Sequence, residues 1–377
     1  MITDIIAKKL ISFFYDSNKR RLLEKKINSI TSFQLKKKPL VSPAPEILSR
    51  HLKFWKVFGH KVNSAWLRIY GNTSGIWDYR FVPESHYYTV VEPCLNDKSY
   101  TKAYTDKNFY SVILKDFRRP ASILHNTGGE FYDNKLQPID SDTIEYLLKT
   151  AGRFIIKPAT DSGGGKGVSL ITVQDQRFIS ETGGEFNPAE LLKKYSRNFV
   201  VQEVIAQHPF YENFNNTSLN TVRILTYRSC ADNSIHILHS LLRVGRRGSI
   251  TDNQASGGFA CGLSDEGTIT GIAVDKYGNT YNEVNSVPLI KGTKLPGIEL
   301  IKRTAIAIAS RFPYARLLGL DLCLDKESQC LVIEVNNVNN EINFFQMTGG
   351  PLFKEFTEEV ISFCLTHRRS FMIDFEI

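Results

Sequence analysis

The sequence has no apolar run approaching the roughly 18 residues that a membrane-spanning helix needs, and its cysteines form no framework. The six cysteines are scattered, with no Cys-x-x-Cys pair, so we expect reduced thiols rather than disulfides. The first residues lack the layout of a signal peptide, because Asp4 precedes most of the apolar residues and lysines interrupt them. These absences favour a cytoplasmic protein.

Most of the chain has almost no net charge, and the positive charge is concentrated near the N-terminus. The 377 residues include 47 Lys and Arg against 39 Asp and Glu, and residues 1–60 hold 13 of the basic residues but only 4 of the acidic ones. The rest of the chain is close to neutral, with 34 basic and 35 acidic side chains. A nucleic-acid enzyme would carry positive charge around its site, so we expect no nucleic-acid partner.

The basic N-terminal segment has the pattern of an amphipathic helix. The apolar residues at helical spacing are Ile2, Ile5, Ile6, Leu10, Phe13 and Phe14. Clusters of Lys and Arg follow, so residues 1–38 are a candidate for contact with a membrane surface or a pyrophosphate-linked carrier. The alternative is a helix docked on the protein with a solvated basic face. Prolines between residues 39 and 45 predict a linker.

A glycine-rich loop lies between two short apolar runs. The run Phe154–Pro158 carries Lys157, four glycines fall within residues 163–167, and a second run starts at Val168. This pattern predicts a hairpin whose N–H groups bind phosphate, with Lys157 adding charge. The residue after Gly165-Lys166 is not the Ser or Thr of a P-loop, and the glycine spacing does not fit a dinucleotide fingerprint. A flexible hairpin tip is the alternative.

Two strand-like runs near the C-terminus carry candidate metal ligands. Pairing Leu324 with Leu331 across a polar turn places Asp321 opposite Glu334. Opposed side chains have Cβ atoms about 4.5–5.5 Å apart, and two carboxylates that close need a cation between them. Asn336 shares the face of Glu334, and oxygen ligands of this kind suit Mg²⁺. The alternative is that one acid faces solvent or pairs with an arginine.

Several motifs follow one another in a characteristic order along the chain. They are Asp106-Lys107, Lys157 with its glycine hairpin, Gln202-Glu203-Val204-Ile205, Asn220-Thr221-Val222-Arg223, Asp321 and Glu334-Val335-Asn336. This order resembles the ATP-grasp superfamily over about residues 100–350. Within the superfamily the pattern is most similar to the sugar-transfer-associated ATP-grasp proteins, found among enzymes that make bacterial surface polysaccharides.

The resemblance implies an α/β (α+β) fold in which two lobes clasp ATP, preceded by a smaller N-terminal domain. We expect a basic helical segment and linker at 1–45 and a small α/β domain at 46–105, with a strand at Tyr87–Val91. An ATP-grasp lobe with the glycine-rich hairpin would occupy 106–205, and a second lobe with the metal hairpin 206–377.

The resemblance also implies a role for each matched residue. The ATP-binding residues would be Lys107, Lys157, Ser162, Gly163, Gly164, Gly165, Lys166, Gly167, Gln202, Glu203, Val204, Ile205 and His208. Two Mg²⁺ ions would be held by Asp321, Glu334 and Asn336. Arg223 and Arg243 would supply positive charge to the reacting phosphate. The acceptor side would be lined by Asn253, Gly257 and Gly258.

The sequence departs from the family pattern at two places. Many relatives have an arginine two residues before the first metal Asp, but here that position is Gly319, so Arg223 or Arg243 must supply the charge. No acidic residue clearly matches the usual ribose ligand after the adenine-binding strand. The chain offers Gln207 and His208 there, and His208 is equally well explained as a structural residue.

The implied reaction is ATP- and Mg²⁺-dependent ligation. A substrate carboxylate attacks the γ-phosphate, and an amine then displaces phosphate from the acyl phosphate to form an amide. From the sugar-transfer resemblance we expect the carboxylate of a uronic acid, in a surface polysaccharide or its precursor, joined to an amino acid or small amine. The alternatives are a kinase acting on a sugar or small molecule, and a non-catalytic nucleotide-binding module.

Overall fold

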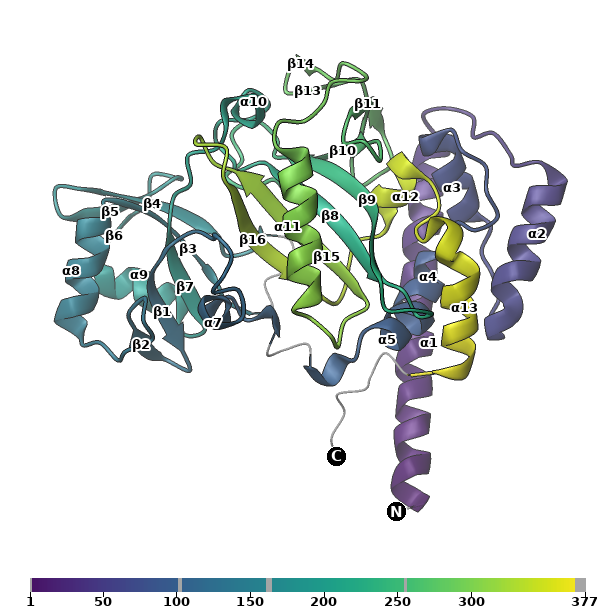
Figure 1. Cartoon of the computed structure of the whole chain (residues 1–377), viewed down its shortest axis with the longest axis horizontal. Helices are drawn as coiled ribbons and strands as arrows, with labels where there is room; N and C mark the ends of the chain where they lie inside the picture. The colour runs from purple at the N-terminus through teal and green to yellow at the C-terminus, as the bar shows by residue number, and fades with distance from the viewer. Residues whose placement is uncertain (1, 101–103, 161–164, 254–255, 370–377) are drawn as a thin grey trace.

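The computed structural model describes residues 2–100, 104–160, 165–253 and 256–369, with residues 2–5 and 99 described by their backbone only. A lobe built on one sheet, a larger lobe built on a second sheet, and a group of helices lie side by side (Figure 1). The N-terminal end of the first helix projects away from the rest. None of the described helices is both long and apolar enough to span a membrane.

The first lobe is an antiparallel sheet covered on one face by two helices. Its seven described strands, in spatial order, are β2 (Glu130–Tyr132), β1 (Ser122–Thr127), β7 (Phe199–Glu203), β3 (Arg153–Pro158), β4 (Ser169–Gln174), β5 (Arg177–Ser180) and β6 (Glu185–Phe186). Helices α8 (Ser141–Ala151) and α9 (Pro188–Tyr195) pack on one face. Side chains alternate along β3, so Ile156 enters this core while Ile155 and Lys157 line a cavity on the opposite face.

The second lobe is a larger antiparallel sheet. Its described strands, in spatial order, are β12 (Thr280–Tyr281), β11 (Ile269–Val274), β10 (Phe259–Leu263), β9 (Ile235–Val244), β8 (Thr221–Arg228), β15 (Leu317–Leu324) and β16 (Cys330–Asn336). A separate hairpin consists of β13 (Glu283–Val284) and β14 (Val287–Pro288). Helix α11 (Ile298–Ser310) covers one face, where Ile224 and Leu320 are fully buried.

The remaining described elements are helical. Before the first lobe they are α1 (Ile2–Leu35), α2 (Pro45–Trp55), η1 (Lys56–Phe58), α3 (Ala65–Ser74), α4 (Glu84–His86), η2 (Tyr87–Val91), α5 (Glu92–Leu95), η3 (Lys98–Tyr100), η4 (Lys107–Phe109) and α7 (Tyr110–Ile113). Later in the chain they are α10 (Pro209–Glu212), α12 (Asn343–Gly349), η7 (Lys354–Phe356) and α13 (Thr357–Thr366).

The prediction of a small α/β domain at 46–105 is wrong, because the described residues of this segment form helices and no strand. The predicted strand at Tyr87–Val91 is a π-helical turn that continues α4 into α5. Tyr87 and Val91 are fully buried, and the turn contacts both α1 and α13. In a short apolar run that is buried on several sides, the sequence shows no alternation of polar and apolar residues, so its pattern cannot distinguish a strand from a buried helix.

Local signals in the sequence account for some of the observed elements. Asn187 and Glu190 form a capping box at the start of α9, which fixes that helix locally. All six cysteines lie in the described residues, and none of them is in a disulfide.

One apolar core joins the N-terminal helices to the second sheet. It contains Ile27 of α1, Trp66 of α3, Leu225 of β8 and Ile342 before α12, all of them fully buried. The predicted segments 1–45, 46–105 and 206–377 thus contribute to a single core. The second sheet has α11 on one face and the N-terminal helices with α12 and α13 on the other.

This shared core predicts that the N-terminal helices and the second lobe unfold together. Replacing Ile342 by Ala removes a fully buried side chain and should lower the free energy of unfolding by about 2–5 kcal/mol. All three tryptophans, Trp55, Trp66 and Trp77, lie in the N-terminal part, so their fluorescence should follow the same shifted denaturant transition as the circular dichroism. Ile290→Ala, at a side chain 67% exposed, is the matched control. A tryptophan transition that does not shift in Ile342→Ala would contradict the shared core.

Candidate active site between the two lobes

The two lobes enclose a cavity of about 590 Å³. It is lined from the first lobe by residues of β3, β4 and β7, and from the second lobe by residues of β8, β9, β15 and β16. The cavity brings Lys107, Lys157, Asp321 and Glu334 together from distant parts of the sequence. Apolar walls with a few converging charged groups are typical of a ligand site.

The hairpin of β15 and β16 places Asp321 directly opposite Glu334, as predicted. The pairing near the turn is nevertheless shifted by one residue, because Leu324 pairs with Cys330 and not with Leu331. An irregularity after Asp321 restores the predicted register. A β-bulge of this kind adds one residue to one strand and re-aims the side chains beyond it.

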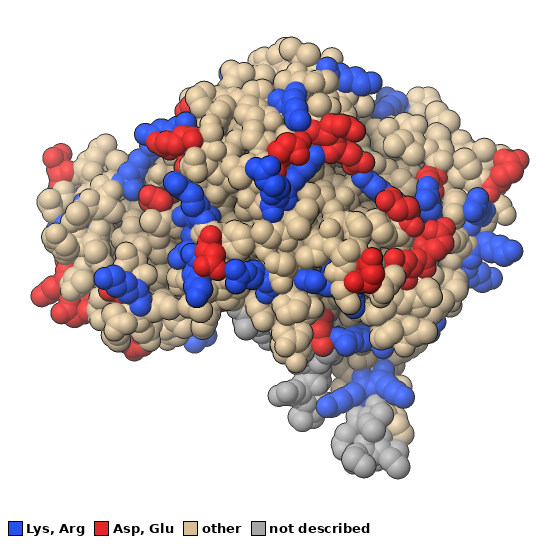
Figure 2. All heavy atoms as spheres, viewed as in Figure 1, with Lys and Arg blue, Asp and Glu red and all other residues tan. Residues whose placement is uncertain are grey.

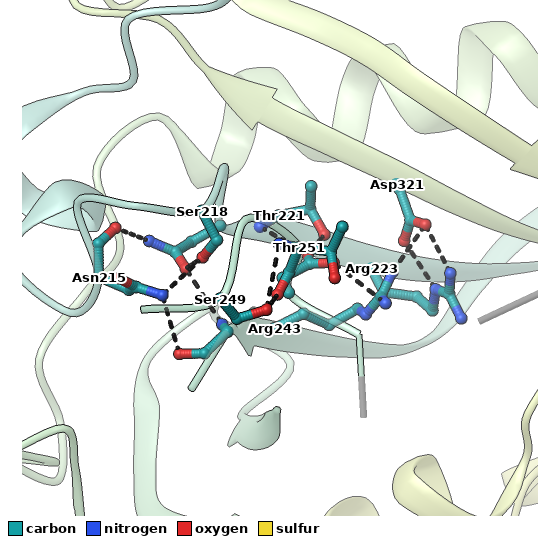
Figure 3. A network of polar contacts seen from close by, with 11 residues as sticks. Asn215, Ser218, Thr221, Arg223, Arg243, Ser249, Thr251 and Asp321 are labelled. Atoms are coloured by element: carbon teal, nitrogen blue, oxygen red, sulfur yellow. Dashed lines mark hydrogen bonds and ion pairs between the residues drawn. The ribbon is translucent and has the colours of Figure 1, made fainter. Parts of the chain in front are cut away.

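Asp321 is held by two arginines from neighbouring strands (Figure 3). Arg223 lies opposite Asp321 in the β8–β15 register and donates from Nε and Nη2 to its two carboxylate oxygens, at 2.7 and 2.5 Å. Arg243 of β9 donates from Nη1 to Oδ2 at 2.8 Å. Burial alone would raise the pKa of Asp321, but the two arginines overcome this effect and hold the pKa at about 2. Asp321 is therefore a buried carboxylate that stays charged.

A second buried acid, Asp252, was missed by the sequence analysis. Its Oδ1 lies 3.1 Å from Nη2 of Arg243, and its Oδ2 accepts hydrogen bonds from the backbone N–H and the hydroxyl of Thr221. Burial raises the pKa of this carboxyl, although Arg243 opposes the shift. Asp252 precedes the predicted acceptor residue Asn253 in a loop, where no period or spacing singled it out. It anchors Arg243 independently of Asp321.

The two predicted phosphate-binding lysines both line the cavity. The Nζ atom of Lys107 lies 2.8 Å from Oε1 of Glu334. The backbone N–H of Lys107 donates to the carbonyl of Ala159, directly after β3, the strand that carries Lys157. Burial lowers the pKa of Lys157 to about 8, with the charge of Lys107 acting in the same direction and Glu334 opposing it. Two lysines converging on one face of a cavity favour an anionic ligand there.

The predicted adenine-binding strand lines the cavity with Gln202, Glu203, Val204 and Ile205. The buried Oε1 of Gln202 has no hydrogen-bond partner among the described residues, so it can accept from a ligand. The Glu203 side chain accepts from the backbone N–H of Ala121 at 2.8 Å, which also gives it a structural role at the start of β1.

His208 does not line the cavity in the described structure. Its Nδ1 accepts from the backbone N–H of Phe210 at 3.1 Å, so it caps α10. Glu212, four residues further on, does line the cavity. Its carboxylate is a candidate to bind the ribose hydroxyl groups. The sequence did not reveal this residue, because its distance from β7 fitted no expected spacing.

Only part of the predicted glycine loop can be placed. Ser162, Gly163 and Gly164 lie outside the described residues. Gly165 lines the cavity with φ +70° and lies close to Thr251 and Asn253 of the second lobe. Lys166 and Gly167 belong to the turn that leads into β4, and neither lines the cavity in the described structure.

The predicted acceptor residues separate in the structure. Asn253 lines the cavity, whereas Gly257 and Gly258 do not. The Gly257 carbonyl oxygen accepts from Nε of Arg246 at 3.3 Å. A Cβ atom at Gly258 would lie within 3 Å of three backbone carbonyl oxygens. Close approach of the backbone accounts for this second glycine.

The predicted metal ligand Asn336 pairs across the hairpin with Gly319, the position where many relatives have an arginine. Asn336 donates from Nδ2 to the Gly319 carbonyl at 3.2 Å and does not line the cavity. A Cβ atom at Gly319 would collide with Oδ1 of Asn340, so any side chain at this position would require Asn340 to move. Arg223 and Arg243 instead bring the positive charge to Asp321.

The cavity residues fit a nucleoside triphosphate with Mg²⁺. The lysines match anionic phosphates, the unpartnered Gln202 oxygen matches an exocyclic amine, and Asp321 with Glu334 supplies hard oxygen ligands. The described residues contain no group of three or more His, Cys, Asp and Glu side chains able to hold a metal alone. A metal at Asp321 and Glu334 would therefore take its other ligands from Asn336, water or phosphate.

Comparison with protein families gives an independent result. The family model described as sugar-transfer associated ATP-grasp matches residues 88–361. The chain therefore belongs to the sugar-transfer-associated ATP-grasp family. A search of curated proteins found no match.

Two of the solved structures that match the chain are those of ligating enzymes. The ATP-grasp ligase PsnB, complexed with a minimal precursor, Mg and ADP, is 13% identical with a TM-score of 0.39, and the match covers 72% of this chain and 62% of PsnB. D-alanyl-alanine synthetase A of Vibrio cholerae is 16% identical with a TM-score of 0.39, over 69% of this chain and 63% of that enzyme. The chain thus spans just under two thirds of either protein. Similarity at this level does not identify a substrate.

The different surroundings of Asp321 and Glu334 predict different effects on stability. The Asp321 side chain is 3% exposed between two arginines, whereas Glu334 is 31% exposed beside one lysine. Asp321→Asn leaves the buried guanidinium group of Arg223 without its counter-charge and Arg243 with Asp252 alone, and should cost about 3–5 kcal/mol in the free energy of unfolding. Glu334→Gln keeps an acceptor for Lys107 and should cost about 1 kcal/mol. Urea unfolding measures both, and equal losses would contradict the buried arginine pairing.

Proposed function

We propose that this chain is an ATP- and Mg²⁺-dependent ligase that activates a carboxylate as an acyl phosphate and joins it to an amine. The observation that carries the proposal is the convergence of Lys107, Lys157, Asp321 and Glu334 on one interlobe cavity in a chain of an ATP-grasp family. Phosphoryl transfer requires mainly positioning and charge stabilisation, which the two lysines would provide directly and the two carboxylates through a bound Mg²⁺.

The adenine end of the nucleotide would lie against β7 and the segment after it. Gln202 would accept from the exocyclic amine, and Glu212 would bind the ribose hydroxyl groups. Lys107 and Lys157 would contact the phosphates, with Gly165 and its neighbours in the hairpin above them. Phosphate oxygens would also stabilise the charged form of Lys157, whose pKa burial lowers to about 8.

Asp321, Glu334 and Asn336 would hold Mg²⁺, which supplies charge neutralisation for the phosphoryl oxygens when bound. A metal at Asp321 would compete with Arg223 and Arg243 for its carboxylate oxygens, which already accept three hydrogen bonds from them. Arg243 keeps Asp252 as a second partner, so it stays at the cavity wall with a free donor. We infer that the two arginines then bind the oxygens of the transferred phosphate or of the substrate carboxylate.

The family description supports a sugar-linked acceptor. We therefore propose the carboxylate of a uronic acid, in a bacterial surface polysaccharide or its precursor, and an amino acid or small amine as its partner. Arg243 and Asn253 on the acceptor side of the cavity suit a carboxylate and its neighbouring hydroxyl groups. A precursor carried on a membrane would give residues 1–38 a role in peripheral membrane contact at the inner face.

Phosphate release from ATP and Mg²⁺ across a matrix of uronic acids and amines tests the ligase, with mass spectrometry of the products. We expect release to need both partners and the product to be lighter by one water than their sum. Glu334→Gln should lower kcat by about 100-fold or more, since it removes a metal ligand that acts on the reacting phosphate, while retaining the fold. Glu327→Gln is the matched control, because Glu327 is 59% exposed on the turn between β15 and β16 and does not line the cavity.

Two results of this assay would contradict the ligase. A product heavier by one phosphoryl group, formed without an amine, would make the protein a kinase. ATP binding with no phosphate release from any combination, including lipid-linked and polymeric uronic acids, would make it a nucleotide-binding module.

A further inference from the structure

The first helix carries an apolar stripe on the part that projects from the protein. In α1 the first fully described turns expose Ile6 and Leu10, each by 53%, and Phe13 by 63%. Their spacing puts them on one helical face. From Leu23 onward α1 is packed into the core of the protein. Figure 1 shows this part of α1 projecting beyond the other described elements, and its three apolar side chains are more than half exposed in the described structure.

This stripe leads directly into a small cationic pocket. Ser17 and Arg20 continue the face of Ile6, Leu10 and Phe13 along the helix, and both line a pocket of about 150 Å³ together with Phe13. Its volume is about a quarter of that of the interlobe cavity (150 against 590 Å³), so the pocket suits a small anionic group such as phosphate.

The positive charge of the pocket comes from arginines of both chain ends. Arg20 of α1, Arg368 and Arg369 line it, and Figure 2 shows basic side chains around the point where α1 leaves the protein. Arg20 donates from Nη2 to the hydroxyl of Thr89 at 3.2 Å, but its buried Nε has no hydrogen-bond partner among the described residues. That N–H needs an acceptor, and the pocket is where one can bind.

Acidic side chains partly offset this charge. Asp16 also lines the pocket, and Arg369 forms an ion pair with Asp97 at 2.7 Å. The pocket also contains His60, whose pKa is lowered to about 4 by burial and by the charges of Arg20 and Arg368. Glu24, outside the lining, also acts on Arg20. Among the residues that line the pocket, three guanidinium groups face the single carboxylate of Asp16, so the lining itself is net positive.

We propose that this pocket binds the phosphate of an anionic membrane lipid while the apolar stripe of α1 enters the membrane surface. The rise of 1.5 Å per residue separates Phe13 from Arg20 by about 10 Å along the helix. Interfacial helices bury their apolar faces about 5–10 Å into the headgroup and acyl boundary. Such a helix lies in the plane of the surface, so the pocket, which continues the same helical face, would lie about 10 Å along the surface from Phe13, within reach of a lipid phosphate. A free anion would leave the stripe without a role.

Sedimentation of the full-length protein with vesicles tests this site. We expect binding to vesicles that mix phosphatidylglycerol with phosphatidylcholine, and weak binding to phosphatidylcholine alone. Arg20→Gln and Arg368→Gln should each weaken binding about fivefold, the effect of one basic side chain at an anionic membrane. Phe13→Ser should weaken binding in both low and high salt, because it removes apolar contact. Arg368 is exposed, so its variant gives a result even if the Arg20 variant does not fold.

Arg177→Gln is the matched control, since Arg177 is 69% exposed on β5 in the first lobe. Binding by this variant should equal that of the unmodified protein. A loss equal to that of Arg368→Gln would show that total charge and not the pocket governs binding, and would overturn the proposal. Absence of binding to anionic vesicles would overturn it as well. So would thermal stabilisation by inorganic phosphate, lost in Arg368→Gln, without vesicle binding.

Discussion

The pairing of Asp321 with Arg223 and Arg243 is the interaction on which the candidate site depends. A buried carboxylate between apolar strands would become protonated without a counter-charge. The two guanidinium groups reverse this effect and keep Asp321 ionised at neutral pH. Charge, and therefore the ability to bind a divalent cation, is retained in a position that is otherwise shielded from water. The same two groups are available to anionic ligands once the carboxylate has another partner.

The pairing also depends on the larger sheet. Arg223 and Asp321 are opposed on adjacent strands, and Arg243 is opposed to Thr221 one strand further on. The side chains of Arg223 and Asp321 lie on one face of the sheet. Further along the same strands, that face carries Leu225 and Leu317, which pack against the N-terminal helices. The N-terminal helices therefore support the strands that position the acid and its two arginines. Asp252 completes the arrangement from a loop, by holding Arg243 from the side opposite Asp321.

Much of the site could be predicted from the sequence, because it rests on short motifs and on the alternation of strands. Lys157 and the acids Asp321 and Glu334 are placed by side-chain alternation alone, and the bulge in β16 leaves their pairing intact. Asp252 and Glu212 could not be found in this way, since both lie outside regular strands and are brought to the cavity by the tertiary fold. The turn Tyr87–Val91 was mistaken for a strand because burial on several sides removes the polar positions that reveal a period. His208 follows the predicted adenine-binding strand as expected for a nucleotide ligand, but its ring caps helix α10 instead.

In the proposed reaction, Asp321 and Glu334 change partners, from arginine and lysine to a metal ion, when a nucleotide enters the cavity. The anomalous scattering of Mn²⁺ in crystals grown with a non-hydrolysable ATP analogue tests this exchange directly. We expect a Mn²⁺ peak bound to both carboxylates, with the Arg223 and Arg243 guanidinium groups moved from Asp321 toward the phosphates. A nucleotide bound in the cavity with no metal at these acids, and with both arginines still on Asp321, would contradict it.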